Sequence, residues 1–364
     1  MIMRVLASPG LGARESNPYT WLLYSRLACR VEDFSYSRAA WKSYEVVHFH
    51  WPEAPLNSTL TEFRAKASVL RDLMLIEGLR SRGSKVFWTV HNLGAHEGRY
   101  PTLEPWFWDC FTAKLDAFIA LTQTGLVAAR NRFPRLRHTP GFVIPHGHYR
   151  DEYPARPRTD CRRALNLPSH AKVILFFGQI RAYKNILGLI SEFRAIRDES
   201  TFLVIAGESL SDDLSRQICQ EGRSDTRIRL SLGHVPKDRV STYFGAADLV
   251  ALPYHEILNS GTALLALSLN RPVLVPLRGA MGELAQEVGQ EWVRPFLGEL
   301  TVSALKDALT WALETPRSFE APLDHLDWNG LAQRTLAAYE AILAGPVIGG
   351  PRPFLEDRVC TILA

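Results

Sequence analysis

The stretch YHEILNSGTALLALSLNRPVLVP, residues 254–276, decides the fold class. A polar loop leads through the small residues Asn-Ser-Gly-Thr at 259–262 into an apolar run at 263–269. Because this run is apolar nearly all round, it predicts a buried helix. The helix is expected to end at Asn-Arg-Pro, residues 270–272, before a short β-rich segment at 273–275. A loop, a buried helix and a strand in this order are typical of one unit of an α/β sheet.

The same alternation extends over most of the chain. In the first half, strands are expected at residues 3–8, 46–50, 85–91, 117–121 and 141–145, and helices at 18–27, 60–82 and 103–114. In the second half, strands are expected at 173–178, 202–207, 228–232, 249–253 and 273–275, and helices at 186–197, 210–221, 237–246 and 261–269. The pattern predicts two Rossmann-like, doubly wound parallel-sheet domains facing each other, with ligands bound in the cleft at the carboxyl ends of the strands.

The predicted boundaries give two domains, a final helix and a tail. The N-terminal domain spans residues 1–150, and a link rich in proline and charge opens the C-terminal domain, residues 151–325. A helix at 326–344 is expected to pack back toward the N-terminal domain. The tail at 345–364 carries several Pro and Gly residues, so we expect it to be loosely held.

Composition limits the classes of partner. The 364 residues carry a net charge of only +4, which is too weak to indicate nucleic acid and suits a phosphorylated ligand or an anionic membrane surface. The five cysteines are scattered without metal-ligand spacing, which predicts reduced thiols in the cytoplasm. The N-terminus resembles a strand rather than a signal peptide, and no apolar run is long enough to span a membrane.

Two segments that follow strands in the C-terminal domain predict anion sites. In GQIRAYKN, residues 178–185, Gly178 allows a tight turn, and Arg181 and Lys184 can converge on one phosphate. The alternative is a solvated basic loop. The segment contains no P-loop, and no GxGxxG follows the first strand, which disfavours an ATPase and a dinucleotide oxidoreductase.

The second anion site is expected at the start of the buried helix. A helix N-terminus presents unpaired N–H groups and a partial positive charge. Gly261 removes a side chain that would hold a phosphate away, while Ser260 and Thr262 add hydroxyl groups. The alternative is an ordinary N-cap, where Asn and Ser are preferred. Two anion sites in one domain predict a diphosphate ligand.

The N-terminal half carries proton-transfer chemistry instead. Its strand ends read HFHWPE at 48–53, TVHNLGAHE at 89–97 and IPHGHYRDEY at 144–153. Histidine and carboxylate groups are the usual proton acceptors near neutral pH, although each histidine alone can equally be structural. Glu53, His96 and Glu97 lie beyond strand ends and are expected to face the cleft. No HExxH or Cys/His set is present, so we expect no metal.

These motifs, together with LPYHEILNSGTALLALSLNRPVL at 252–274, resemble the GT-B glycosyltransferases, and more narrowly the xanthan-type bacterial β-mannosyltransferases. The resemblance covers residues 1–344. It implies a GT-B fold and transfer of mannose from GDP-mannose, with inversion and without metal, to a polyprenyl-diphosphate-linked oligosaccharide in exopolysaccharide synthesis. It also implies a cytoplasmic enzyme that contacts the inner membrane peripherally and binds no nucleic acid.

The resemblance implies that the two domains bind different substrates. It implies that the donor contacts residues of the C-terminal domain, namely Gly178, Arg181, Lys184, Tyr254, Glu256, Asn259, Ser260, Gly261 and Thr262. The acceptor would contact the N-terminal domain at Asn17, Tyr19, His50 and His146. The catalytic base is expected to be Glu97, Glu53 or His96, in that order. Asn17 can also simply cap the helix that Pro18 begins.

One departure bears on stereochemistry. Many retaining GT-B enzymes carry two glutamates eight residues apart, but the position that follows Glu256 by eight is Leu264, which favours inversion. The basic segment 60–85 is either an interfacial helix or an ordinary surface helix. Alternatives for the function are a GT-B transferase that uses UDP-glucose, UDP-glucuronate or GDP-fucose, a nucleotide-sugar epimerase, and a non-catalytic binding protein.

Overall fold

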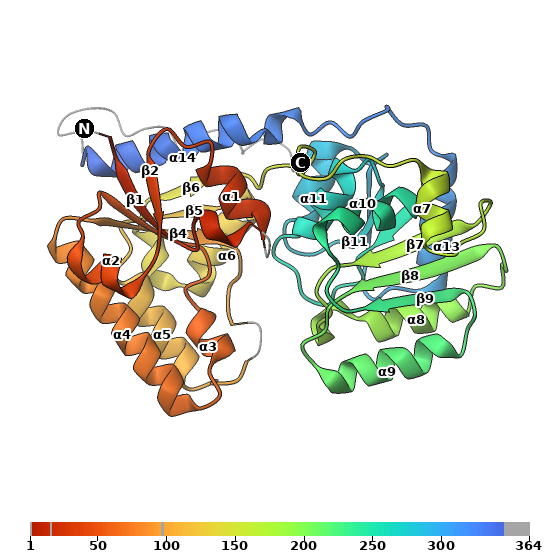
Figure 1. Cartoon of the computed structure of the whole chain (residues 1–364), viewed down its shortest axis with the longest axis horizontal. Coiled ribbons are helices and arrows are strands. Elements are labelled where there is room, and N and C mark those ends of the chain that lie inside the picture. Colours follow the sequence, from red (N-terminus) through yellow and green to blue (C-terminus); the bar gives the residue numbers. More distant parts are fainter. Residues whose placement is uncertain (1, 15–16, 96–97, 346–364) are drawn as a thin grey trace, which may run out of the picture.

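The chain forms two α/β halves, each built on a six-stranded parallel sheet with helices on its faces (Figure 1). The computed structural model describes residues 2–14, 17–95 and 98–345. The first sheet has the strand order β2-β1-β3-β4-β5-β6 and the second the order β12-β11-β10-β7-β8-β9. This arrangement confirms the predicted pair of doubly wound sheets.

Within the described residues, the first half contains strands β1 to β6 and helices α1 to α6. Its strands are β1 (Arg4–Ser8), β2 (Arg30–Asp33), β3 (Val46–Phe49), β4 (Lys85–Val90), β5 (Ala117–Ala120) and β6 (Gly141–Val143). Its helices are α1 (Pro18–Tyr24), α2 (Tyr36–Trp41), α3 (Ala54–Ser58), α4 (Glu62–Ser81), α5 (Leu103–Thr112) and α6 (Gln123–Arg132). The central strands β3 to β5 are buried almost throughout, as expected for a parallel sheet covered on both faces.

The second half repeats the plan. Its strands are β7 (Lys172–Phe177), β8 (Thr201–Gly207), β9 (Ile228–Leu232), β10 (Leu249–Ala251), β11 (Val273–Pro276) and β12 (Val293–Phe296). Its helices are α7 (Arg158–Ala164), α8 (Ile186–Arg194), α9 (Asp212–Arg223), α10 (Lys237–Ala246), α11 (Gly261–Ser268), α12 (Met281–Val288) and α13 (Val302–Glu314). Loops that follow strands of both sheets line one cavity between the halves.

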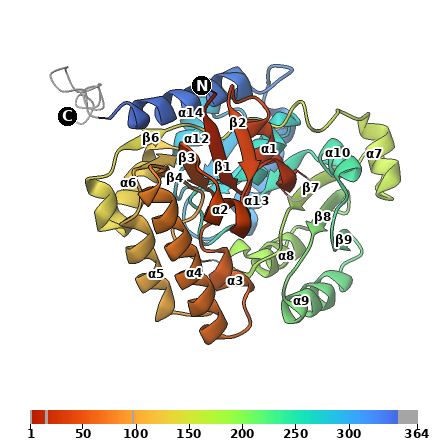
Figure 2. The same cartoon turned by 60° about the vertical axis from the view of Figure 1, so that its left-hand side comes forward.

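The last described helix, α14 (Trp328–Leu343), returns to the first half and lies beside α1 (Figures 1 and 2). The Tyr339 hydroxyl of α14 lies 2.6 Å from Nδ1 of His48 at the end of β3. At the start of α14, the Trp328 indole donates to the carbonyl of His148, also at 2.6 Å. A C-terminal element therefore takes part in the core of the N-terminal half.

The sequence patterns missed elements whose composition hides them. The edge strand β2 has the sequence RVED, which is short and charged, and the edge strand β12 contains a proline. Edge strands tolerate such residues because one of their sides needs no sheet partner. The polar helix α6 was also not predicted. Within the described residues, no helix is long and apolar enough to cross a membrane.

Candidate active site

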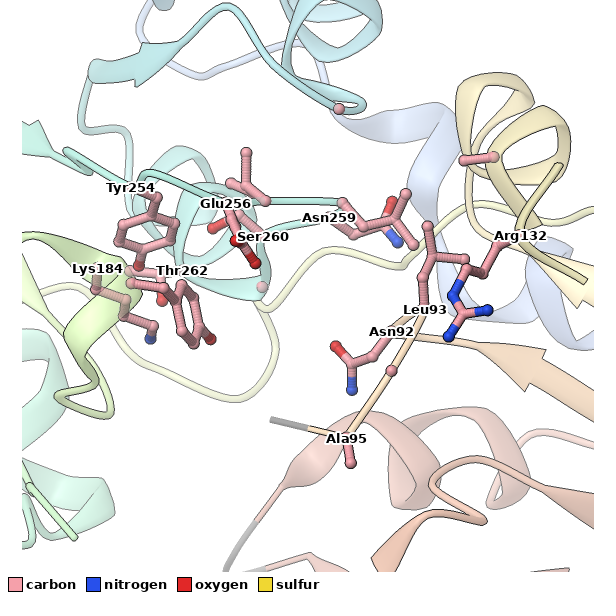
Figure 3. A pocket seen from close by; sticks show the side chains of 17 residues that line it. Asn92, Leu93, Ala95, Arg132, Lys184, Tyr254, Glu256, Asn259, Ser260 and Thr262 are labelled. Carbon is pink, nitrogen blue, oxygen red and sulfur yellow. The ribbon is translucent and has the colours of Figure 1, made fainter. Parts of the chain in front are cut away.

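A cavity of about 640 Å³ opens between the carboxyl ends of the two sheets (Figure 3). From the first half it is lined by the loop after β4, which carries Asn92 and Ala95, and by Ala128 and Arg132 of α6. From the second half it is lined mainly by the loop after β10 and the start of α11. The cavity therefore lies where two facing doubly wound sheets are expected to bind a ligand.

Most of the residues predicted for the donor lie together in the wall of this cavity. They are Lys184, Tyr254, Glu256, Asn259, Ser260, Gly261 and Thr262. Gly178 lies directly behind them, since a Cβ atom at this position would be 3.1 Å from Thr262 Oγ1 and 3.8 Å from Lys184 Nζ. Arg181 begins the short turn Ala182–Lys184 and does not line the cavity, and its guanidinium donates to Gln179 Oε1 at 3.4 Å.

Two glycines allow these loops to approach each other. Gly178 has a φ of +116° and Gly207, at the end of β8, a φ of +146°. A Cβ atom at Gly207 would lie 1.9 Å from the carbonyl oxygen of Gly178, which no side chain can accommodate. The backbone after β7 therefore passes close enough to bring Lys184 against the start of α11.

Lys184 is the buried cation of the cavity. Its ammonium lies 5.1 Å from the centre of the Tyr254 ring, which is a cation–π distance. Burial, assisted by the charge of Arg181, lowers the pKa of Lys184 to about 8. A desolvated ammonium next to a cavity gains most from an anionic ligand, because that ligand restores the interactions that water no longer provides.

The start of α11 has the N-cap that the sequence analysis gave as one of its two interpretations. Ser260 is an N-cap, because its Oγ accepts a hydrogen bond from the N–H of Ala263 at 3.1 Å. Gly261 and Thr262 are the first two residues of the helix, where backbone N–H groups have no partner within the helix, and both residues line the cavity. The remaining helix from Ala263 to Ser268 is buried, which fixes its direction. A cap and an anion site are thus compatible at this helix end.

Asn259 adds unpaired polar atoms to the same wall. Both Oδ1 and Nδ2 of Asn259 are buried, and neither has a hydrogen-bond partner in the described part of the chain. A buried amide without partners costs about 1–3 kcal/mol. A ligand that offers both a donor and an acceptor at this position would remove that cost.

The residues predicted for the acceptor are placed differently. Tyr19 makes edge-to-face contacts with His50, His91, His146 and Trp328, at centroid distances of 4.8–5.5 Å. Asn17 caps α1 by accepting from the N–H of Tyr19 at 3.1 Å. None of Asn17, Tyr19, His50 and His146 is among the residues that line the 640 Å³ cavity. Their roles toward an acceptor remain a prediction.

The buried histidines form a hydrogen-bonded network with these aromatic rings. His50 Nε2 lies 2.7 Å from the Tyr24 hydroxyl, and its Nδ1 lies 3.0 Å from His91 Nε2. His48 contacts Tyr24 and Tyr339 through Nδ1 and Thr89 through Nε2. Burial lowers the pKa of His48 to about 3, so this histidine is neutral at physiological pH. Within the described residues, no cluster of three or more His, Cys, Asp or Glu could hold a metal ion.

Among the three candidate bases, only Glu53 lies in the described residues, because His96 and Glu97 fall outside them. Glu53 is 2% exposed and accepts a hydrogen bond from Asn92 Nδ2 at 3.3 Å. Burial raises its pKa from 4.5 to about 7. Since Asn92 lines the cavity, the Glu53 carboxyl lies directly behind the cavity wall.

The structure adds residues that the sequence analysis did not single out. Asn92 belongs to the quoted TVHNLGAHE motif, and its position at a strand end could have revealed it. Arg132 lies on α6, a helix whose polar sequence gave no apolar period. Glu283 of α12 accepts hydrogen bonds from the backbone N–H groups of Gln123 and Thr124, both at 2.9 Å, and so joins the second half to the start of α6.

Comparisons with known proteins agree with this architecture. A family model described as glycosyl transferases group 1 matches residues 171–314. The GDP-mannose:glycolipid 4-β-D-mannosyltransferase of Xanthomonas campestris pv. campestris is 32% identical over 329 residues, which cover 89% of this chain and 88% of that protein.

Solved structures show the same fold at low sequence identity. The sucrose-phosphate synthase of Thermosynechococcus elongatus superposes with a TM-score of 0.64 at 16% identity, over 94% of this chain and 97% of that one. Anabaena HepE in complex with UDP-glucose superposes with a TM-score of 0.59 at 14% identity, over 94% and 95% of the two chains. The chain is therefore a glycosyltransferase of the GT-B fold, and it belongs to the family of the Xanthomonas GDP-mannose:glycolipid 4-β-D-mannosyltransferase.

Proposed function

We propose that this enzyme transfers mannose from GDP-mannose to a glycolipid, with inversion at the anomeric carbon. The donor and the class of acceptor follow from the name of the Xanthomonas relative, which aligns with 89% of the chain. The observation that carries the proposal is the convergence of Lys184, Gly178 and the start of α11 on one cavity. This is the arrangement that a nucleoside diphosphate requires.

In this proposal the C-terminal domain, residues 151–325, holds the donor. The diphosphate lies against the N–H groups of Gly261 and Thr262 and pairs with the ammonium of Lys184, with Arg181 adding longer-range positive charge. As the bond between the sugar and GDP breaks, negative charge grows on the leaving phosphate. Groups that are already oriented toward this position stabilise it without a metal ion.

The N-terminal domain, residues 1–150, binds the acceptor and supplies the base. The acceptor hydroxyl attacks the anomeric carbon from the face opposite GDP and loses its proton to a carboxylate. Glu53 fits this role through its pKa near 7 and its contact with Asn92, while Glu97 and His96 are the other candidates. Leu264, at the position of the second glutamate of retaining enzymes, supports inversion.

We further propose that the acceptor is a polyprenyl-diphosphate-linked oligosaccharide of a bacterial exopolysaccharide. The enzyme would then act at the cytoplasmic face of the inner membrane, where such an acceptor is accessible to a protein that contacts the bilayer peripherally.

The proposal is tested by measuring how much GDP and other nucleoside diphosphates stabilise the unchanged protein and the Lys184→Ala variant against heat. Thermal stabilisation by GDP should exceed that by UDP, ADP and TDP, because a ligand that binds only the folded state stabilises it in proportion to RT ln(1 + [L]/Kd). The stabilisation should disappear in Lys184→Ala and persist in the control Lys306→Ala, whose side chain is exposed on α13. Selective stabilisation by UDP would overturn the mannose assignment.

A further inference from the structure

Helix α4 carries two apolar faces, and only one of them packs against the protein. Ala65, Val69, Leu73 and Ile76 are buried against the first half. On the opposite side, Phe63 is 82% exposed, Leu70 42% and Met74 73%. These three residues are spaced seven and four positions apart, so they form one stripe along the helix. The outer face of an ordinary surface helix is polar, whereas this one carries three exposed apolar side chains among its charged residues.

Free positive charge lies beside this stripe. Arg64 and Lys66 are exposed, and neither forms an ion pair in the part of the chain that the structure describes. Other cations of the segment are engaged within the protein, since Arg80 pairs with Glu77 and Asp116 and Lys85 with Asp116. At the end of α4, Arg82 forms no ion pair within the described residues but donates a hydrogen bond to the carbonyl of Ala39. Arg64 and Lys66 lie at the beginning of α4, next to Phe63.

An aromatic cavity of about 270 Å³ borders the same helix. It is lined by the aromatic residues Phe34, Phe49, Trp51 and Phe107. On its α4 side it is lined by Arg71, which follows the stripe residue Leu70 in the sequence. Trp51, Pro52, Ala54 and Pro55 form part of its wall. Glu53, in the same segment, does not line this cavity and accepts a hydrogen bond from Asn92 of the large cleft.

We propose that the outer face of α4 lies on an anionic lipid bilayer, with Phe63, Leu70 and Met74 inserted among the headgroups and Arg64 and Lys66 contacting anionic lipids. This inference rests on the proposed glycolipid acceptor, because a lipid-linked substrate must be taken from a membrane surface. An apolar stripe with basic residues beside it is the pattern of an interfacial helix. Figure 1 shows α4 at the outer edge of the first half, on the left, far from α8 and α9 of the second half.

Sedimentation of the full chain with vesicles tests this assignment. We expect the unchanged protein to bind vesicles of phosphatidylcholine and phosphatidylglycerol at 3:1. The double variant Phe63→Glu/Met74→Glu should bind them more weakly, by about tenfold or more, because two charges replace inserted apolar groups. Arg64→Glu/Lys66→Glu should weaken binding similarly and abolish its salt dependence. The matched control Leu297→Glu/Phe319→Glu changes two exposed apolar residues of the second half and should bind as the unchanged protein does.

The inference is overturned if the unchanged protein does not sediment with these vesicles, or if both α4 variants bind as well as the control. Thermal stabilisation by GDP separates this failure from failure of the proposed function. Both α4 variants should keep the response of the unchanged protein to GDP, because α4 does not line the donor cavity. Loss of vesicle binding with an intact response to GDP supports the assignment, whereas vesicle binding with no response to GDP refutes the donor proposal alone.

Discussion

Glu53→Gln should make the protein more stable above pH 7 and at the same time less active. Glu53 is 2% exposed, and its pKa rises from 4.5 to about 7 because burial disfavours the charged carboxylate. The folded state therefore holds this proton more tightly than the unfolded state does. The stabilisation that this proton provides is complete below about pH 4.5 and is lost as the pH rises to about 7.

The magnitude follows from the difference between the two pKa values. Because the pKa of Glu53 rises from 4.5 to about 7, its ionisation lowers the free energy of unfolding by roughly 3 kcal/mol between pH 4.5 and pH 8. Glutamine keeps an oxygen that can accept from Asn92 Nδ2 and carries no charge to bury. Glu53→Gln should therefore be more stable than the unchanged protein by about 2–3 kcal/mol at pH 8 and nearly equal to it at pH 4.5.

Urea denaturation at pH 5, 6, 7 and 8 measures this effect, and Glu32→Gln provides a control of opposite sign. Burial raises the pKa of Glu32, but hydrogen bonds from Lys42 and Tyr44 outweigh it and lower the pKa overall. The stability that Glu32 contributes is thus present at pH 8 and is lost toward acid pH, so Glu32→Gln should destabilise the protein at pH 8. If Glu53→Gln gained no stability between pH 5 and pH 8, the carboxyl would not be buried as described.

The same reasoning gives three further predictions. If Glu53 is the base, kcat/KM should rise as Glu53 ionises near pH 7, and if Lys184 neutralises the diphosphate, kcat/KM should fall above about pH 8 as Lys184 loses its charge. Glu53→Gln should remove the rise on the acid side. A profile that does not change with pH would contradict both roles. Lys184→Ala should lower kcat/KM for transfer by about 10²–10³-fold, measured by GDP release, and a change below threefold would exclude the ammonium from charge stabilisation. Gly207→Ala should lower the free energy of unfolding by about 3 kcal/mol or more, because its Cβ would clash with the carbonyl of Gly178. In the control Gly330→Ala, on α14, the Cβ meets nothing within 4 Å, so this change should be neutral or stabilising in the same denaturation assay.

Much of the fold was accessible from the sequence because the central strands are buried on both faces. Residues 173–177 and 202–207 are continuous apolar runs, as is typical of strands in a parallel sheet that is covered on both faces. The edge strand Arg30–Asp33 and the polar helix Gln123–Arg132 carry no such signal, because tertiary neighbours rather than local preference hold them in place. The contact of Tyr339 with His48, far apart in the chain, could not be read from local patterns at all.

Most residues predicted to bind the donor line the cleft, whereas none of those predicted to bind the acceptor does. Phosphate chemistry depends on short local features, namely a glycine turn, a lysine and a helix start, which a sequence displays directly. The N-terminal histidines lack this property, since a histidine at a strand end can be a base or a buried structural group. The structure places His48 and His50 in a hydrogen-bonded network with Tyr24, away from the lining of the cleft.

The most direct test of the account is transfer of radiolabelled sugar into organic-extractable lipid, with bacterial membrane lipid as acceptor. Parallel reactions would contain GDP-mannose, GDP-fucose, UDP-glucose or UDP-glucuronate, each with and without added lipid. We predict that label from GDP-mannose enters the lipid fraction only when acceptor lipid is present, and that Lys184→Ala slows this transfer by about 10²–10³-fold. Labelling from a UDP-sugar in its place, or conversion of the nucleotide sugar without any acceptor, would contradict the account.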